Sequence, residues 1–96
     1  MPHYIILFNF TEQGVRNVKD TINRAKAFKS AIEKAGGKFI SEYYTLGKYD
    51  IVTIVEAPND ETILPVILAT GSLGNVRSET LKAFSMDEAA KIIERV

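Results

Sequence analysis

The chain has 96 residues, of which 46% are hydrophobic, and its twelve basic side chains balance twelve acidic ones. The length fits one domain over residues 1–96, and the zero net charge argues against a nucleic-acid or membrane-surface partner. Because there is no cysteine, one histidine and no apolar run near the ~20 residues of a membrane span, we expect a cytoplasmic domain without metal, cofactor or membrane contact.

The first third of the chain predicts a strand, a loop and a helix. Residues 3–10 form an apolar and aromatic run that is too short for a helix and typical of a strand buried on both faces. Residues 11–17 are polar and contain one glycine, which is typical of a loop. Apolar residues then recur at helical spacing over residues 18–35, and Gly36-Gly37 predicts the end of that helix.

Two strands are predicted next, over residues 38–46 and 49–57, on either side of Gly47-Lys48. A two-residue connection with glycine in its first position fits a type II′ hairpin turn, and a longer loop is the alternative. With the short turn, Tyr44 and Tyr49 share one face of the hairpin.

The second half of the chain predicts a helix, a strand and a short last helix. Asn59 is a helix cap, but Pro65 then falls inside the helix, so that the helix either kinks or starts later. Residues 75–84 form the fourth strand. Ser85 to Glu88 match a capping box, which predicts that the terminal helix begins there.

The predicted order is therefore β-α-β-β-α-β with a C-terminal helix. With right-handed crossovers this is an α+β, ferredoxin-like fold whose antiparallel four-stranded sheet has the order 4-1-3-2. The first and third strands are the most apolar, as central strands are, and the other two carry charges, as edge strands do. Since two helices cover only one face of such a sheet, the bare apolar face predicts a homodimer or a larger homo-oligomer.

A resemblance to a known family is found in residues 44–52, which include Gly47, Tyr49 and Asp50. Together with Val55-Glu56-Ala57-Pro58, this stretch resembles the GYD-domain family, which is named for that glycine, tyrosine and aspartate. Residues 10–14 and 71–80 are similar to the family as well. The resemblance implies a small ferredoxin-like domain akin to dimeric α+β-barrel proteins, with no established activity.

Asp50 is the first candidate functional residue. It stands near the start of a central strand, between Tyr49 and an apolar run, where a carboxylate is partly desolvated. It is therefore a candidate general base or ligand-fixing group. The alternative is a turn clamp that accepts hydrogen bonds from Thr45 or from nearby backbone donors.

Three further residues near the hairpin complete the candidate site. Tyr49, Thr45 and Tyr43 lie within a few positions of Asp50, and Tyr43, Thr45 and Asp50 share a face if the turn is short. We expect the ligand site of a small molecule here, between the open sheet face and a second copy of the chain. Since the pleat sends Tyr49 and Asp50 to opposite faces, only one of them can line the site, and Asp50 is favoured. Tyrosines in such places are more often core or interface residues, and no catalytic residue is assigned.

Two functions fit these features. The first is a small-ligand-binding or regulatory homo-oligomer without catalysis, and the regulatory amino-acid-binding domains share this topology. The alternative is a cofactor-independent enzyme, such as a small oxygenase or isomerase, which rests on fold analogy alone. RNA recognition uses the same topology, but the third strand lacks the required basic-Gly-aromatic pattern. An enclosed cavity that contains Asp50 or a tyrosine would favour the enzyme.

Overall fold

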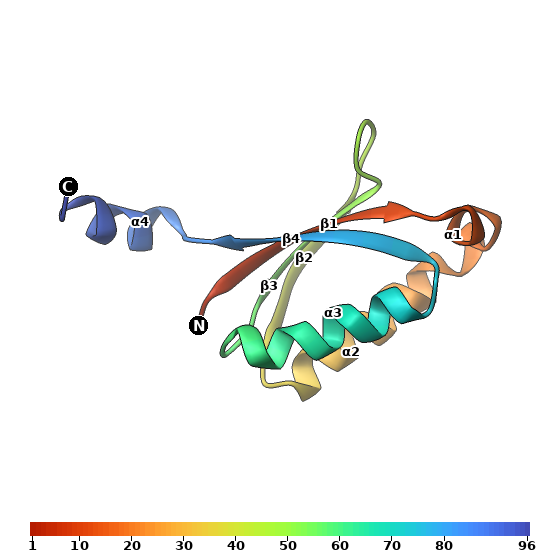
Figure 1. Cartoon of the computed structure of the whole chain (residues 1–96), viewed down its shortest axis with the longest axis horizontal. Helices are drawn as coiled ribbons and strands as arrows, with labels where there is room; N and C mark the ends of the chain where they lie inside the picture. The colour runs from red at the N-terminus through yellow and green to blue at the C-terminus, as the bar shows by residue number, and fades with distance from the viewer.

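Four antiparallel strands form one sheet, and two helices, α2 and α3, cover one of its faces (Figure 1). The computed structural model describes all residues 1–96. Its elements are β1 (His3–Phe10), α1 (Glu12–Arg16), a 3-10 turn η1 (Val18–Asp20), α2 (Thr21–Lys34), β2 (Lys38–Tyr44), β3 (Ile51–Glu56), α3 (Asp60–Ser72), β4 (Val76–Ala83) and α4 (Met86–Ile93). The strand order β2-β3-β1-β4 is the predicted 4-1-3-2 order, which confirms the ferredoxin-like α+β fold.

The core lies between the sheet and the two helices. Tyr4, Ile6 and Phe8 alternate along β1 and are all buried on the helix side. The Phe28 ring of α2 packs edge-on against Phe8, with ring centroids 5.7 Å apart, and Ile32 is buried one turn further along the helix. The other side of β1 is only half-buried, so the prediction of a strand buried on both faces is wrong for the single chain.

The hairpin between β2 and β3 is longer than the two-residue turn. The strands end at Tyr44 and begin at Ile51, and the backbone N–H of Thr45 donates to the Asp50 carbonyl at 2.9 Å to close a six-residue connection. Gly47 supplies a positive φ of 102° within it. Figure 1 shows this hairpin extending away from the sheet on the side opposite to the helices.

The predicted loop over residues 11–17 contains the short helix α1. The Thr11 side chain caps the helix by accepting from the Gly14 N–H at 3.1 Å, while the Thr11 N–H donates to the Asn75 carbonyl at 3.0 Å. A Cβ atom at position 14 would lie 2.0 Å from the Asn75 carbonyl oxygen, so only glycine permits this contact. The short helix therefore depends on contact with the segment before β4.

Helix boundaries follow the predicted caps. Asn59 and Ser85 each form a capping box, and Gly36, with a φ of 86°, follows the end of α2. The helix α3 starts where Asn59 indicates and continues through Pro65. No helix has the length and apolar character that crossing a membrane requires.

The terminal helix α4 projects beyond the end of β4, away from the rest of the molecule (Figure 1). One link to the sheet is the His3 ring, whose Nδ1 lies 3.2 Å from the Glu88 carboxylate and whose Nε2 lies 3.9 Å from that of Glu56. Met86 and Ile93 on the apolar stripe of α4 are 86% and 64% exposed. The helix therefore leaves its apolar side uncovered in the single chain.

Candidate functional site

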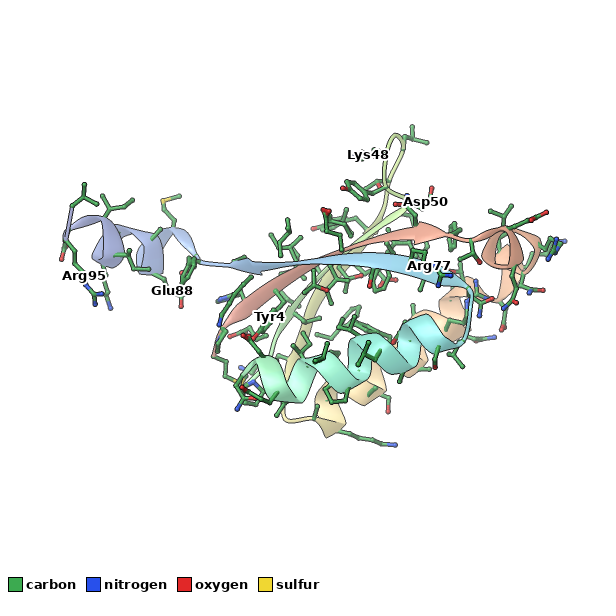
Figure 2. The ribbon with its side chains drawn as sticks, in the orientation of Figure 1. Tyr4, Lys48, Asp50, Arg77, Glu88 and Arg95 are labelled. Atoms are coloured by element: carbon green, nitrogen blue, oxygen red, sulfur yellow. The ribbon has the colours of Figure 1, made fainter.

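The side chain of Asp50 joins the base of the hairpin to the end of β1. Its Oδ2 accepts a hydrogen bond from the Phe10 backbone N–H at 2.8 Å, and its own N–H donates to the Phe8 carbonyl at 2.9 Å. Figure 2 shows Asp50 at the base of the hairpin and Lys48 at its tip. A carboxylate in this position extends the pairing of β1 past Ile51, the first residue of β3.

Thr45 and Tyr49 lie with Asp50 at the hairpin base. The Thr45 hydroxyl donates to the Tyr49 carbonyl at 2.6 Å, and the Tyr49 hydroxyl donates to the Glu79 carboxylate of β4 at 3.2 Å. Glu79 belongs to the side of the sheet that the helices leave open, so Tyr49 lies on that side too. Tyr44 lies on the helix side, so the expected pairing of Tyr44 with Tyr49 on one face is wrong, because the connection is longer than two residues.

Tyr43 is separate from this group. It stands on β2 opposite Val52 and is 60% exposed on the open side of the sheet. Thr45, Tyr49 and Asp50 are thus brought together, with Tyr43 on the same side further along the sheet. Their binding of a small molecule stays a prediction.

The open face of the sheet has an apolar centre and polar ends. Register and burial place six apolar or aromatic side chains there: Ile5, Leu7, Tyr43, Val52, Ile54 and Leu81. Asn9, Arg77 and Glu79 lie towards one end, and His3 with Glu56 lies at the other. An apolar centre with a polar rim is the usual composition of a protein interface.

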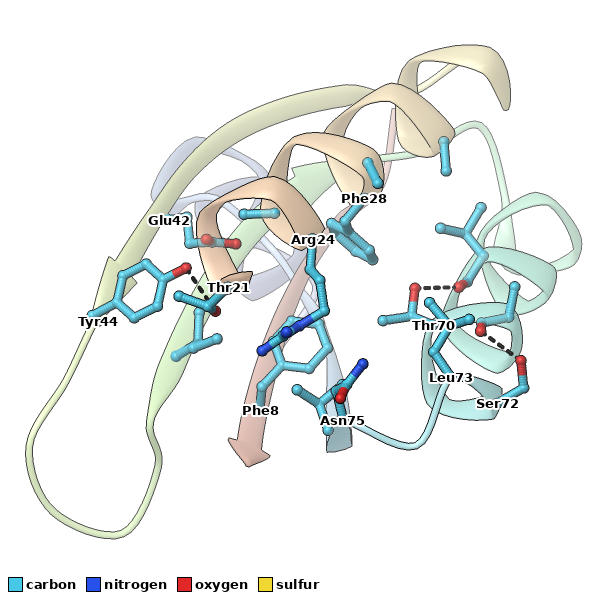
Figure 3. Close-up of a pocket in the computed structure, with 17 residues that line it drawn as sticks. Phe8, Thr21, Arg24, Phe28, Glu42, Tyr44, Thr70, Ser72, Leu73 and Asn75 are labelled. Atoms are coloured by element: carbon cyan, nitrogen blue, oxygen red, sulfur yellow. Dashed lines mark hydrogen bonds between the residues drawn. The ribbon is translucent and has the colours of Figure 1, made fainter. Parts of the chain in front are cut away.

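A cavity of about 380 Å³ lies on the opposite, helix side of the sheet. It lies between α2, α3 and the sheet, is partly open to solvent, and most of its lining is apolar (Figure 3). The polar side chains that matter for its chemistry are Thr21, Arg24, Glu42, Tyr44 and Asn75.

Sequence reasoning missed this cavity. The available signal was the spacing of Arg24 and Phe28, which stand four residues apart and so share one side of α2.

Tyr44 contributes a neutral phenol to the cavity wall. Burial raises its pKa above the ordinary value of 10.0, and a hydrogen bond with Thr21, whose hydroxyl lies 3.3 Å away, only partly opposes that shift. The phenol therefore stays protonated at neutral pH, where it donates and accepts hydrogen bonds but does not act as a base. Glu42, next to it, accepts a hydrogen bond from the buried Thr53 hydroxyl at 2.8 Å.

A third polar group ties β1 to α3 and β4. The buried Tyr4 hydroxyl donates to the Asp60 carboxylate, and Lys82 of β4 lies 3.2 Å from the same carboxylate. Burial, and then the bond to Asp60, raise the pKa of Tyr4 to about 12, while the bonds from Tyr4 and Lys82 lower the pKa of Asp60. This group stabilises the fold and lies apart from the hairpin.

The comparison with known families decides the identity of the chain. The model of the GYD domain family matches residues 4–93. This chain belongs to the GYD domain family. The match covers nearly the whole chain, and it confirms the resemblance that Gly47, Tyr49 and Asp50 carry.

One curated relative covers most of this GYD domain. The chain is 32% identical over 84 residues, 86% of this chain and 88% of the relative, to the glutamine synthetase and cystathionine beta-lyase binding protein of Thermus thermophilus. The crystal structure of TTHA0845, also from Thermus thermophilus, is 28% identical, with a TM-score of 0.56 over 88% of this chain and 95% of that one.

Two more distant structures share the fold alone. The MtbAldR crystal structure has a TM-score of 0.68 at 12% identity over 88% of this chain, which spans about half (52%) of that longer protein. The FFRP-DM1 structure has a TM-score of 0.61 at 16% identity and is covered over its whole length, together with 88% of this chain. Both similarities support the ferredoxin-like arrangement.

Proposed function

We propose that this GYD domain is a cytoplasmic, homo-oligomeric binding protein that regulates an enzyme by attaching to it, without catalysis of its own. The observation that carries the proposal is the relative from Thermus thermophilus, which is named for binding glutamine synthetase and cystathionine beta-lyase. Identity of 32% over 86% of this chain makes a shared mode of action the best-supported reading. The partners proposed for this chain are enzymes of those two kinds.

The open sheet face supports the homo-oligomeric part of the proposal. Its apolar centre would otherwise stay in contact with water, and contiguous apolar patches of more than a few hundred Å² are rare on monomers. A second copy presents the same apolar centre and polar rim, so two copies match each other about a two-fold axis. The hairpin that extends on this side would then lie along the partner copy.

The helix α4 supports the same assembly. It has eight residues, and isolated helices of this length are marginal in water. Its apolar stripe is exposed at Met86 and Ile93, so packing against a second copy would supply the tertiary contact that short helices need.

The hairpin group, which consists of Thr45, Tyr49 and Asp50, is proposed to form the polar edge of this interface. Thr45, Tyr49 and Asp50 stand where the open face meets the hairpin, and Tyr43 stands on β2 nearby. A small molecule bound between two copies would contact these side chains. Such a ligand would control how the copies meet, and through that the binding of the enzyme.

The cavity under the helices favours binding over chemistry. Its titratable groups are the arginine, the glutamate and the tyrosine described above, and the Tyr44 phenol, whose pKa partial burial raises from its ordinary value of 10.0, is protonated at neutral pH. A cavity that contains Asp50 or a tyrosine was expected to favour the enzyme; Tyr44 lines this cavity, but its protonated phenol is not a base, and Asp50 does not line it. The enzymatic alternative therefore has the weaker support.

The test of the proposed function is direct binding to purified enzymes. Biolayer interferometry with bacterial glutamine synthetase and cystathionine beta-lyase should give a Kd in the micromolar range or tighter, and an unrelated enzyme of similar size is the negative control. Leu81→Glu places a charge on the open face, whereas Thr80→Glu places it on the next residue, which points to the other side of β4. Loss of the homo-oligomer is expected for Leu81→Glu only. Binding to neither enzyme above the control level would contradict the proposal.

A further inference from the structure

Arg24, which lines the helix-side cavity, has one guanidinium nitrogen without a protein partner. Arg24 projects from α2 into the cavity, and its Nη1 donates to the Asn17 carbonyl at 3.0 Å. Its Nη2 is shielded by protein atoms and forms no hydrogen bond, and Arg24 takes part in none of the salt bridges of the chain. A buried charged donor without a partner is unfavourable unless something else pairs with it.

Asn75 adds a second donor beside this guanidinium. Its Oδ1 accepts from Gln13 Nε2 at 3.0 Å, so its Nδ2 remains available to donate. Figure 3 shows Arg24 reaching from α2 towards Asn75, with the Phe8 ring beside it. Two nitrogen donors from different elements therefore lie at one end of the cavity.

The remaining lining is suited to an apolar group. Phe8, Phe28 and Val76 form part of the wall, together with alanines of α2 and α3. The volume of about 380 Å³ lies near the lower end of the ~300–1,000 Å³ that small-molecule sites have. A ligand that matches this lining and this volume has one charged end and a compact hydrophobic body.

We propose that this cavity binds a small apolar monocarboxylate. The carboxylate pairs with the Arg24 guanidinium and accepts from Asn75 Nδ2, and the hydrophobic body lies between α2 and α3. A permanently charged guanidinium pairs strongly with a carboxylate, and two donors match its two oxygens. A phosphate presents more acceptor oxygens than these donors satisfy, so a carboxylate is the better match.

Glu42 favours a ligand that carries one carboxylate over a ligand that carries two. Its carboxylate lines the same cavity next to Tyr44, with one oxygen already bonded to Thr53. A second carboxylate on the ligand would be repelled by Glu42 and would find no further cation among the lining residues. The inference does not depend on the proposed function, since it concerns a cavity on the other side of the sheet from the open face.

The test is calorimetric titration of the full chain with 3-phenylpropanoate, 4-methylpentanoate and hexanoate, and with 3-phenylpropanamide as the neutral analogue. We expect at least one carboxylate to bind with a Kd below 1 mM, and 3-phenylpropanamide to bind at least tenfold more weakly than 3-phenylpropanoate. Amide chemical shifts of Phe8, Phe28 and Val76 should move on titration. Glutarate, a diacid, should bind at least tenfold more weakly than hexanoate.

Three variants separate the cavity from general charge effects. Arg24→Met should reduce carboxylate affinity at least tenfold, whereas Lys29→Met, which removes a charge from an exposed position of α2 outside the cavity, should leave it unchanged. Ala31→Leu fills the cavity while keeping Arg24, and it should abolish binding of acid and amide alike. If none of the three acids binds, if the amide binds as tightly as its acid, or if Arg24→Met and Lys29→Met behave alike, the proposal is overturned.

Discussion

Asp50 shows at the level of a single residue how a turn residue is fixed by hydrogen bonds. The sequence indicated a partly desolvated carboxylate and left two roles open, a functional group and a clamp. Its Oδ2 accepts from the Phe10 N–H, which is a contact of the clamp type. The face expected for Tyr49 was wrong, because the side on which Tyr49 lies depends on the length of the connection, and that length is set by contacts with β1 and β4.

Substitution of Asp50 should therefore depend on whether the new side chain can still accept. Asp50→Ala leaves the Phe10 N–H without its partner and should lower the free energy of unfolding by about 1–3 kcal/mol. Asp50→Asn keeps an acceptor oxygen and should cost about 1 kcal/mol or less. Urea unfolding of both variants measures the difference, and equal, near-zero effects would show that the carboxylate does not hold the hairpin.

Asp60 should make the free energy of unfolding depend on pH in the acid range. Hydrogen bonds from Tyr4 and then Lys82 lower its pKa in the folded state, so the folded chain favours the charged form. Its stabilising contribution is complete above the unfolded value of about 3.9 and is lost as the pH falls through the lower folded pKa. Asp60→Asn should be less stable than the wild type at pH 7, and the two proteins should converge in stability near pH 2.

Thermal unfolding of the two proteins across that pH range, with Glu61→Gln as the neighbouring control, checks this prediction. A difference between the wild type and Asp60→Asn that stays constant down to pH 2 would contradict it.

At the level of elements, the ends of the helices were easier to predict than the short segments between them. Asn59, Ser85 and Gly36 act through their own neighbours in sequence, so their patterns were sufficient. The helix α1 was missed because Gly14 is required by the Asn75 backbone, which lies some sixty residues further along the chain. Contacts of that range leave no periodic pattern in a single sequence.

Pro65, inside the helix α3, allows a prediction about the stability of that helix. Proline in a helix interior removes one hydrogen bond and crowds the preceding turn, at a cost of roughly 3 kcal/mol relative to alanine. Because α3 continues through Pro65 and the residue is exposed, Pro65→Ala should raise the free energy of unfolding by about 1–3 kcal/mol. Chemical denaturation measures this change. A loss of stability on replacement would contradict this prediction, and would mean that the proline ring packs against a surface outside the single chain.

At the level of the whole molecule, the sheet separates two surfaces with different chemistry. The helix side contains the core and a cavity lined by a half-buried arginine, and the open side has an apolar centre between polar ends. The order of the strands and the bare face followed from the sequence, because hydrophobic pattern and topology set both. The cavity did not, because it results from how α2 and α3 are spaced over the sheet.

Charge is also distributed unevenly along the chain. Residues 1–48 carry eight basic and four acidic side chains, and residues 49–96 carry four and eight. Salt screens such an asymmetry beyond about 10 Å at 0.1 M ionic strength, so its contribution to the association of two copies is minor. In the proposed assembly, the apolar centre of the open face and the exposed side of α4 supply most of the association energy.

Sedimentation velocity of the purified chain at micromolar concentration tests this account most directly. The chain has a mass of 10.7 kDa, and the account predicts a species of at least twice that mass, which Leu81→Glu converts to the monomer and Thr80→Glu does not. A wild-type chain that sediments as a monomer at those concentrations would contradict the assembly through the open face, and with it the homo-oligomeric binding protein proposed above.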